Sequence, residues 1–312
     1  MANSTFFFLF GKIFEAIKES SYWAVNRTAI FSLSPNREVA EATKNTAIIF
    51  LSTAFGSAIA GLTLAYFGFP LTLGLFTVVA LIIAVPAVLL WKNVNNHFKI
   101  KKSDVRQIID LKSYDKRFWL ISITLLFFSL AFYPLLNLLI PVFMAQQLGF
   151  SYVTIGIAYM GFNLVASLVV FSALKSSLGS KRVIIQVVIA LFASFFLAAS
   201  NYYFLPMFLM LAISEGLGMG FFEAIIAKAV KDKPSVSIDI GLLHIPMRFA
   251  EFASLLYTGF IAEKFGYAPV FAFSGIFFLF FSILALYFEP TDRAYHSKHR
   301  LLRFNRKEYR VE

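Results

Sequence analysis

The chain has 312 residues, of which 59% are apolar and 14% are charged, and it contains no cysteine. Soluble globular domains are about 45–50% apolar and about 25% charged, so this composition excludes an ordinary soluble enzyme and favours a membrane protein. The absence of cysteine excludes a disulfide framework, a thiolate metal site and a cysteine nucleophile. The net charge is +11, and in a membrane protein the positions of the basic residues indicate orientation.

Nine apolar segments have, or nearly have, the length of about 20 residues that a helix needs to cross a bilayer. Because the runs are continuous and do not alternate, they are typical of helices rather than strands. In chain order the predicted helices are 5–31, 45–67, 70–91, 118–143, 151–174, 183–200, 203–227, 240–262 and 267–288. We therefore predict an all-α polytopic membrane protein with about nine transmembrane helices.

A polar, basic segment at 92–117 separates three predicted helices from the six that follow. The other connections are short, which predicts antiparallel neighbours packed in one bundle. The predicted domains are a partial N-terminal half at 1–91, a cytoplasmic linker at 92–117, a six-helix half at 118–290 and a basic cytoplasmic tail at 291–312.

The basic residues predict the orientation of the chain. If the linker and the tail are cytoplasmic, the inner connections hold 24 of the 28 Lys and Arg, with Arg27 counted among them, whereas the outer connections hold only Lys264. This distribution predicts a cytoplasmic C-terminus in the cell membrane. It also explains the net charge without a nucleic-acid partner, and we expect the tail to contact anionic lipids.

The first three predicted helices resemble the last three. Gly61, Phe67 and Gly68 match Gly259, Phe265 and Gly266 at an offset of 198 residues, and residues 15–30 align with 215–230. Parallel repeats of this kind belong to transporters whose two halves rock around a central site. Residues 118–200 then have no counterpart, so the pattern predicts an incomplete N-terminal half.

The segment 172–182, with the sequence SALKSSLGSKR, joins two predicted helices on the cytoplasmic side. It resembles the loop motif of the major facilitator superfamily, Gly-x-x-x-Asp-(Arg/Lys)-x-Gly-x-(Arg/Lys)-(Arg/Lys). Gly179, Lys181 and Arg182 match the motif, whereas Ser172 and Ser176 replace its glycine and its acid. The resemblance implies that the nine helices correspond to the fourth through twelfth of a twelve-helix transporter, which would then lack its first three.

Three ionisable residues of 240–262 fall on one helix face, because His244, Arg248 and Glu251 are spaced i, i+4 and i+7. A charge at mid-bilayer costs at least about 2.5–3.5 kcal/mol, so we expect them to line a cavity. His244 or Glu251 would take a proton, and Arg248 would hold an anionic group. The alternative is a structural ion pair between Arg248 and Glu251, with a histidine near the cytoplasmic end.

Glu215 lies near the middle of 203–227 and is followed by Gly216, Gly218 and Gly220, which let another helix approach closely. We predict that it binds and releases a proton, the alternative being a protonated side chain bonded to a neighbouring helix. Glu223 lies nearer the cytoplasmic end of this segment. For this residue a structural or loop-anchoring role is as well supported as a role in transport.

Weaker polar candidates lie on other predicted helices. Glu15, Lys18 and Glu19 form a compact patch that either belongs to the solute pathway or sits partly in water. Asn137 and Asn163 bind solute or hydrogen-bond a neighbouring helix. Two prolines within 118–143 predict a kink, and most of the 39 Phe are expected to face lipid.

These patterns contain no catalytic constellation, no phosphate-cradling loop and no metal cluster, so we predict no enzyme activity, no cofactor and no metal. Two hypotheses remain open. The chain is a secondary active transporter that moves a small solute by alternating access with proton coupling, or it is a truncated, transport-inactive membrane protein with a structural or regulatory role. A separate N-terminal fragment is an expected partner if the gene is split.

Overall fold

A computed structural model describes residues 5–34, 37–91, 114–173, 179–197, 202–230 and 236–288, and all of its regular elements are helices. The predicted all-α class is therefore confirmed. Two long helices come first, α1 (Thr5–Leu33) and α2 (Glu38–Trp91). Most of the predicted linker and all of the predicted tail lie outside the described residues.

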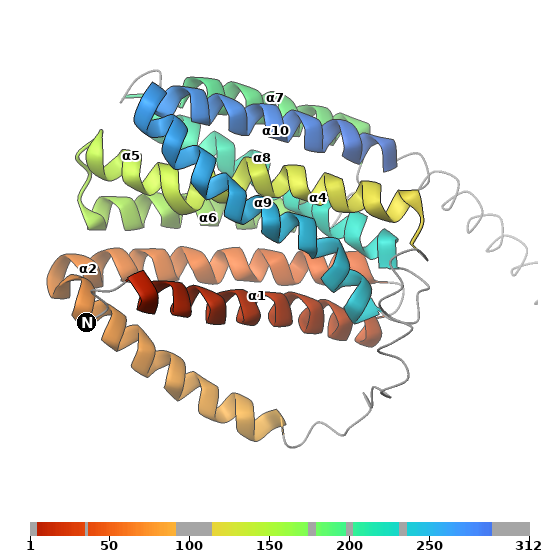
Figure 1. The fold of residues 1–312 in the computed structure, drawn as a ribbon, viewed down its shortest axis with the longest axis horizontal. Helices are drawn as coiled ribbons and strands as arrows, with labels where there is room; N and C mark the ends of the chain where they lie inside the picture. The colour runs from red at the N-terminus through yellow and green to blue at the C-terminus, as the bar shows by residue number, and fades with distance from the viewer. Residues whose placement is uncertain are drawn as a thin grey trace, which may run out of the picture.

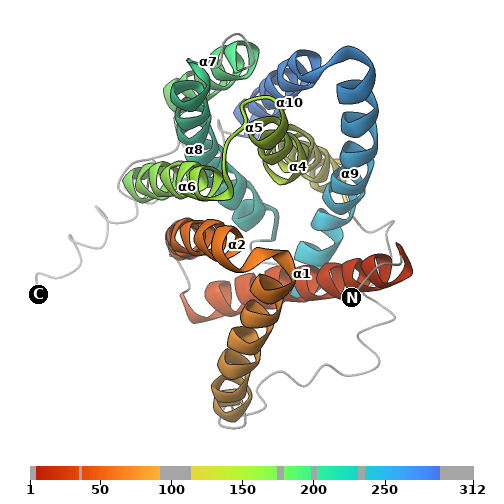
Figure 2. The same ribbon diagram turned by 90° about the vertical axis from the view of Figure 1, so that its left-hand side faces the viewer.

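The second part of the chain contains the remaining elements. In chain order they are α4 (Lys116–Pro134), η2 (Leu135–Leu139), α5 (Ile140–Gln146), α6 (Tyr152–Ala173), α7 (Ser180–Phe196), α8 (Phe204–Val230), α9 (Val236–Phe265) and α10 (Tyr267–Phe288). Figure 2 shows α4 and α8 to α10 grouped together, with α1 and α2 on one side of the group.

Two predicted helices, 45–67 and 70–91, form the single element α2, which breaks at Gly68. This residue has φ 68° and ψ 176°, a conformation that residues with a Cβ rarely adopt. The second half of α2 then runs away from the rest of the bundle (Figure 1), and most of its large apolar side chains are exposed. The break falls where the sequence predicted a turn between two crossings.

The predicted helix 118–143 contains a wider turn at the place where a kink was expected. The π-helix η2 follows Pro134 and ends just before α5, whose second residue is Pro141. Proline has no backbone N–H to donate to the preceding turn, so the regular hydrogen-bond ladder is interrupted here. Single π-helical turns inside α-helices occur frequently at functional sites.

The helices pack in pairs that bring distant segments together. α4 contacts α9 and α10, α8 contacts α6 and α7, and α1 contacts α9. The first half of α2 lies along α6, as Figure 1 shows. At their crossing a Cβ on Gly61 would lie 2.9 Å from the Cα of Gly156, so the two backbones touch. This contact joins the N-terminal part of the chain to the C-terminal part.

Aromatic side chains fill the centre of the C-terminal bundle. Six of them are less than 2% exposed, namely Phe162, Phe204, Phe208, Phe271, Phe278 and Phe281. Rings such as those of Phe162 and Phe208, with centroids 4.5 Å apart, stack on one another. The expectation that Phe faces lipid is wrong for these residues. A Phe side chain is as favourable in an apolar helix interface as on the lipid-facing surface, so its residue type alone does not distinguish the two positions.

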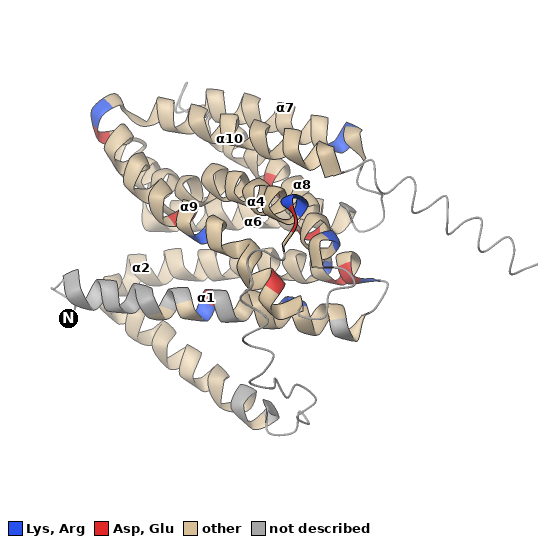
Figure 3. Ribbon diagram, turned by 45° about the vertical axis from the view of Figure 1, so that its right-hand side comes forward, with Lys and Arg blue, Asp and Glu red and all other residues tan. Residues whose placement is uncertain are grey.

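Five stretches of the described chain are long and apolar enough to cross a membrane: Glu38–Pro86, Lys116–Gln146, Tyr152–Ser172, Phe204–Val230 and Tyr267–Phe288. The first has 49 residues, enough for two crossings of about 20 residues each. α1, α7 and α9 are outside this set, so nine crossings remain a prediction. Charged residues are sparse along the helices and gather mainly toward one end of the bundle (Figure 3).

Candidate solute and proton pathway

A buried ion pair joins α1 to α8. Arg27 is 2% exposed and Glu223 is 1% exposed. The Nε of Arg27 donates to Oε2 of Glu223 at 2.9 Å, and its Nη2 donates to Oε1. The hydroxyl of Thr46 in α2 donates to the same Oε1 at 2.8 Å. Arg27 was expected in a cytoplasmic connection, and this is wrong because it lies within α1. The bidentate bond to the carboxylate of Glu223 allows its guanidinium to be buried between the helices.

A second charged cluster lies where α1 meets α9 and α4. Nη1 of Arg248 donates to Oε2 of Glu251 at 2.7 Å, and Nη2 lies 3.9 Å from Oε2 of Glu19. Glu251 also accepts from the hydroxyl of Ser129 at 3.1 Å, and Nζ of Lys18 donates to Glu19 at 2.5 Å. Two patches that the sequence predicted separately, on the first and the eighth predicted helices, therefore form one network.

Trp23 links this cluster to the buried ion pair. Its Nε1 donates to Oε2 of Glu19 at 3.0 Å, and the guanidinium carbon of Arg27 lies 4.1 Å from the centre of its ring. Sequence reasoning missed both Trp23 and Arg27 as parts of this polar network. The signal was the spacing of Glu19, Trp23 and Arg27 at i, i+4 and i+8, which places all three along one face of α1.

His244 is buried on the face of α9 that looks toward α1. Its Nδ1 is 2.7 Å from the carbonyl oxygen of Ile240, so this nitrogen carries the proton and donates it to the backbone. The ring lies edge-on to Phe222, with centroids 6.1 Å apart. Nε2 is left as the free position of the imidazole. The predicted grouping of His244 with Arg248 and Glu251 on one side of α9 agrees with their contacts.

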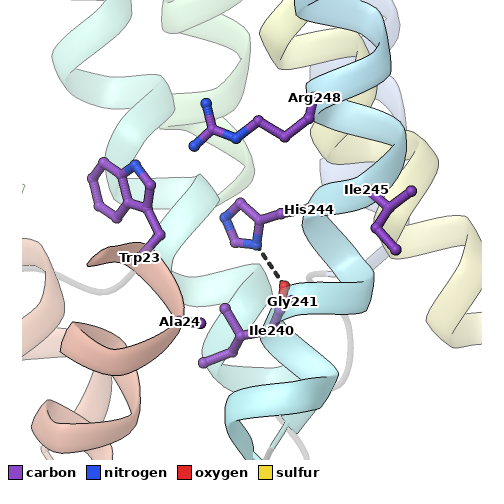
Figure 4. A pocket seen from close by; sticks show the side chains of 7 residues that line it. All are labelled: Trp23, Ala24, Ile240, Gly241, His244, Ile245 and Arg248. Atoms are coloured by element: carbon purple, nitrogen blue, oxygen red, sulfur yellow. Dashed lines mark hydrogen bonds between the residues drawn. The ribbon is translucent and has the colours of Figure 1, made fainter. Parts of the chain in front are cut away.

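A pocket of about 190 Å³ lies between α1 and α9. Figure 4 shows the side chains of Arg248 and His244 extending from α9 toward Trp23 of α1. The other residues of its wall are Ala24, Ile240, Gly241 and Ile245. The pocket is therefore mainly apolar, with an arginine and a histidine as its polar groups.

Glu215 lies apart from these charges, in the middle of α8. It is 5% exposed, and its Oε2 has no hydrogen-bond partner among the described residues. A Cβ on Gly216 would lie 2.8 Å from the carbonyl oxygen of Ala166 in α6, and one on Gly218 would lie 2.9 Å from the ring of Phe128 in α4. The glycines after Glu215 thus allow the close helix packing that the sequence predicted.

Tyr159 connects the surroundings of Glu215 to the π-helix. The phenol interacts electrostatically with Glu215. Its hydroxyl donates to the carbonyl oxygen of Leu136 in η2 at 2.6 Å. The hydroxyl of Tyr159 therefore donates to the interrupted helix and not to Glu215, whose Oε2 has no partner among the described residues.

Other predicted pathway residues do not join these clusters. The amides of Asn137 and Asn163 donate to backbone carbonyls of their own helices, those of Tyr133 at 3.0 Å and Tyr159 at 2.8 Å. Asn137 is also exposed. The side chain of Glu15 lies outside the part of the chain that the structure describes.

The loop motif is described only in part, because residues 174–178 fall in a gap. Gly179 precedes the first residue of α7 and acts as its N-cap with extended backbone angles. Lys181 is exposed, whereas Nη1 of Arg182 is buried without a partner among the described residues. The described residues contain no group of three or more His, Asp or Glu that could bind a metal ion.

One further contact lies outside the predicted membrane segments. The hydroxyl of Tyr114, just before α4, donates to Oδ1 of Asp239 in the first turn of α9 at 2.6 Å. Burial and this hydrogen bond to a carboxylate raise the pKa of Tyr114 to about 12. The contact ties the end of the linker to α9.

Comparison with known protein families gives a match to the Major Facilitator Superfamily over residues 1–227 and again over residues 135–309. The two overlapping matches together span most of the chain. Comparisons with curated proteins and with solved structures give no match.

Proposed function

The chain belongs to the Major Facilitator Superfamily, a family of secondary transporters and not of enzymes, and we propose that it moves its solute by alternating access with proton coupling. Family membership makes the chain an integral membrane protein that carries a small solute. The coupling ion and the residues of the pathway are proposals that go beyond family membership.

We place nine crossings in the chain, counting each half of α2 once and treating α4, η2 and α5 as one. They would correspond to the fourth through twelfth helices of the family, with residues 1–91 and 118–290 on the two sides of the linker. The break at Gly68 supports two crossings within α2. The concentration of basic residues in the linker and the tail, which together hold 15 of the 28 Lys and Arg, supports a cytoplasmic location of both segments in the cell membrane.

Glu215 is the proposed proton-binding residue, and one observation carries this assignment. Its carboxyl group is buried in the middle of α8, yet one of its oxygens has no hydrogen-bond partner in the described part of the chain. A buried charge without a partner is costly, so the neutral acid is favoured until an opening cavity brings water. Alternating access supplies such a change, because it exposes the cavity to each side in turn.

The charged cluster of Lys18, Glu19, Arg248 and Glu251 is the proposed cytoplasmic part of the pathway, with His244 in the pocket wall. The network crosses from α1 to α9, two helices that belong to different halves of the chain. Movement of the halves against each other would separate Glu19 from Arg248. This 3.9 Å contact is the weakest in the cluster and could break without leaving either residue unpaired.

The test uses the purified full chain in liposomes that contain a pH-sensitive dye. A panel of sugars, organic acids, peptides and organic cations is added one at a time under an imposed pH gradient. At least one class should change the rate of proton movement. Glu215→Gln should reduce this proton movement at least tenfold while exchange of the same labelled solute persists.

The matched control is Glu263→Gln, which removes an exposed carboxylate near the end of α9 and should leave proton movement unchanged. Proton movement at the wild-type rate in Glu215→Gln would refute the assignment of Glu215. If the whole panel leaves proton movement unchanged, proton coupling is refuted, and labelled exchange then separates an uncoupled transporter from the transport-inactive alternative.

A further inference from the structure

The pocket between α1 and α9 contains an arginine, Arg248, whose Nε and Nη2 edge makes no hydrogen bond among the described residues. Nη1 of Arg248 is taken by Glu251 at 2.7 Å. Its Nε is buried and has no hydrogen-bond partner among the described residues, and its Nη2 reaches only Glu19, at 3.9 Å. A buried donor without an acceptor costs about 1–3 kcal/mol. The Nε and Nη2 edge therefore lacks the acceptor that would satisfy it.

The geometry of that edge favours one kind of acceptor. Nε–H and Nη2–H point in parallel from a planar guanidinium, and a carboxylate accepts both hydrogen bonds at once. Arg27 illustrates the arrangement in the same region, since its Nε and Nη2 both bind Glu223. Arg248 presents the same edge, and its side chain extends toward Trp23 across the pocket (Figure 4).

The other residues of the pocket wall indicate which chemical group could be attached to the bound carboxylate. Trp23, Ala24 and Ile240 give an apolar surface, and the volume of about 190 Å³ is below the about 300–1,000 Å³ of pockets that hold drug-sized ligands. Trp23 is held in place by Glu19 on its Nε1 and by Arg27 over its ring. A small apolar group thus has a fixed aromatic surface to lie against.

The surrounding charges permit an anion. Lys18 pairs with Glu19, Arg27 with Glu223 and Arg248 with Glu251, so the described charged groups around the pocket balance one another. His244 donates its Nδ1 proton to the carbonyl oxygen of Ile240, so its ring is neutral and adds no charge to the wall. No excess negative charge among these groups opposes a carboxylate.

We propose that this pocket binds small amphipathic carboxylic acids, with the carboxylate on the Nε and Nη2 edge of Arg248 and the apolar part against Trp23. The proposal names the solute class for the transporter proposed above and therefore rests on that function. Binding itself is measured without transport, so the two can fail separately.

The test reads the fluorescence of Trp23 in a variant that carries Trp91→Phe and Trp119→Phe, because Trp is present at only three positions. The full chain is placed in nanodiscs of phosphatidylcholine and titrated with phenylacetate. Phenylacetamide and phenethylamine serve as the neutral and the cationic probes of the same shape. We expect a saturable change with phenylacetate and at least tenfold weaker binding of the other two.

Two substitutions test the contacts. Arg248→Lys keeps the charge but loses the paired donors, and it should weaken phenylacetate binding at least tenfold, whereas Arg37→Lys at an exposed position should not. Gly241→Leu should fill the pocket without a clash, because a Cβ there meets no atom within 4 Å. Gly259→Leu, at an equally open position of the same helix, is its matched control and should bind normally.

Equal binding of phenylacetate and phenylacetamide would overturn the proposal, and so would unchanged binding in Gly241→Leu. Loss of binding when the nanodiscs contain anionic phospholipid would also overturn it, because a lipid headgroup would then be the occupant. Transport of another solute class together with no fluorescence change would refute this solute class and leave the transporter function standing. Binding of phenylacetate without flux of any solute in the panel would support the pocket and refute the transporter function alone.

Discussion

Two glutamates on α8 occupy opposite electrostatic surroundings although only eight residues, or about 12 Å of helix, separate them. Glu223 has a guanidinium on both oxygens and a threonine hydroxyl on one of them. Glu215 is almost as buried, yet its Oε2 has no partner in the described chain. Burial alone therefore does not assign a role to an acid in this bundle, whereas the partners of each oxygen do.

The difference teaches how one helix can serve two purposes. Glu223 connects α1, α2 and α8, so its charge is permanently matched and its loss would loosen the contact between three helices. Oε2 of Glu215 has no hydrogen-bond partner among the described residues, so protonation of this carboxyl group would break no hydrogen bond to that oxygen. We interpret Glu223 as a structural anchor between α1, α2 and α8, and we propose Glu215 as the proton-binding residue.

The largest effect is expected at the buried pair. Glu223→Gln leaves Arg27 as a buried charge without a counter-ion and should lower the free energy of unfolding by about 3–5 kcal/mol. Arg27→Met should cost a similar amount. The double variant Arg27→Met/Glu223→Met removes both charges and should recover most of the loss. Unfolding in detergent with increasing dodecyl sulfate measures these values.

If either single variant lowers the free energy of unfolding by less than about 1 kcal/mol, the ion pair is exposed to solvent, and the contrast with Glu215 no longer holds. A double variant as unstable as the sum of the two singles would show that the residues act independently.

The packing that encloses Glu215 should give the next largest effect. Gly216→Ala places a Cβ 2.8 Å from the carbonyl oxygen of Ala166, and overpacking of this kind costs about 1–3 kcal/mol. Gly259→Ala, where a Cβ meets nothing within 4 Å, is the control and should be neutral or stabilising by up to about 1 kcal/mol. If both variants unfold alike in the same assay, α6 and α8 are not in close contact.

Asp239 is a third acid to compare with Glu215 and Glu223. It accepts a hydrogen bond from the hydroxyl of Tyr114 and lies outside the predicted membrane segments. Tyr114→Phe removes that hydrogen bond and should cost about 1 kcal/mol near neutral pH. Because folding raises the pKa of Tyr114 from 10.0 to about 12, this contribution is complete below pH 10 and disappears as the pH rises to about 12. Unfolding midpoints of both proteins at pH 8 and pH 11 test this, and a constant difference would contradict it.

The smallest effect on stability is expected at Glu215 itself. Glu215→Gln removes no partnered charge, so its free energy of unfolding should stay within about 1 kcal/mol of the wild type. The same substitution should reduce proton movement at least tenfold, as proposed above. A destabilisation as large as that of Glu223→Gln would mean that Glu215 has a structural partner, and the comparison between the two glutamates would then fail.

Particular residues show where sequence reasoning succeeded and where it stopped. The spacing of His244, Arg248 and Glu251 predicted one helix face, because helical geometry is local. The alternative of an Arg248–Glu251 pair was also correct at the level of contacts. Asn137 and Asn163 were equally polar candidates, but each donates to its own helix, and no local pattern distinguishes that outcome from binding across helices.

The greatest miss was Arg27, which was counted as a cytoplasmic basic residue. Its partner Glu223 lies 196 positions away, and a bidentate pair between two helices leaves no trace in the spacing of either one. Trp23 was missed for a different reason. Its partners Glu19 and Arg27 lie four residues away on the same face of α1, so the spacing was visible in the sequence but was not used.

The sequence alone determined that this is an all-α membrane protein, approximately where its helices lie, that a turn falls at residues 68–69 and that the chain resembles the Major Facilitator Superfamily. These properties depend on composition and on contacts within a few residues, which are visible in one dimension. Only the tertiary structure decided which Phe are core, which charges are paired and which carboxyl oxygen is free. Lipid and protein interior are equally apolar, so only helix packing separates an exposed position from a buried one.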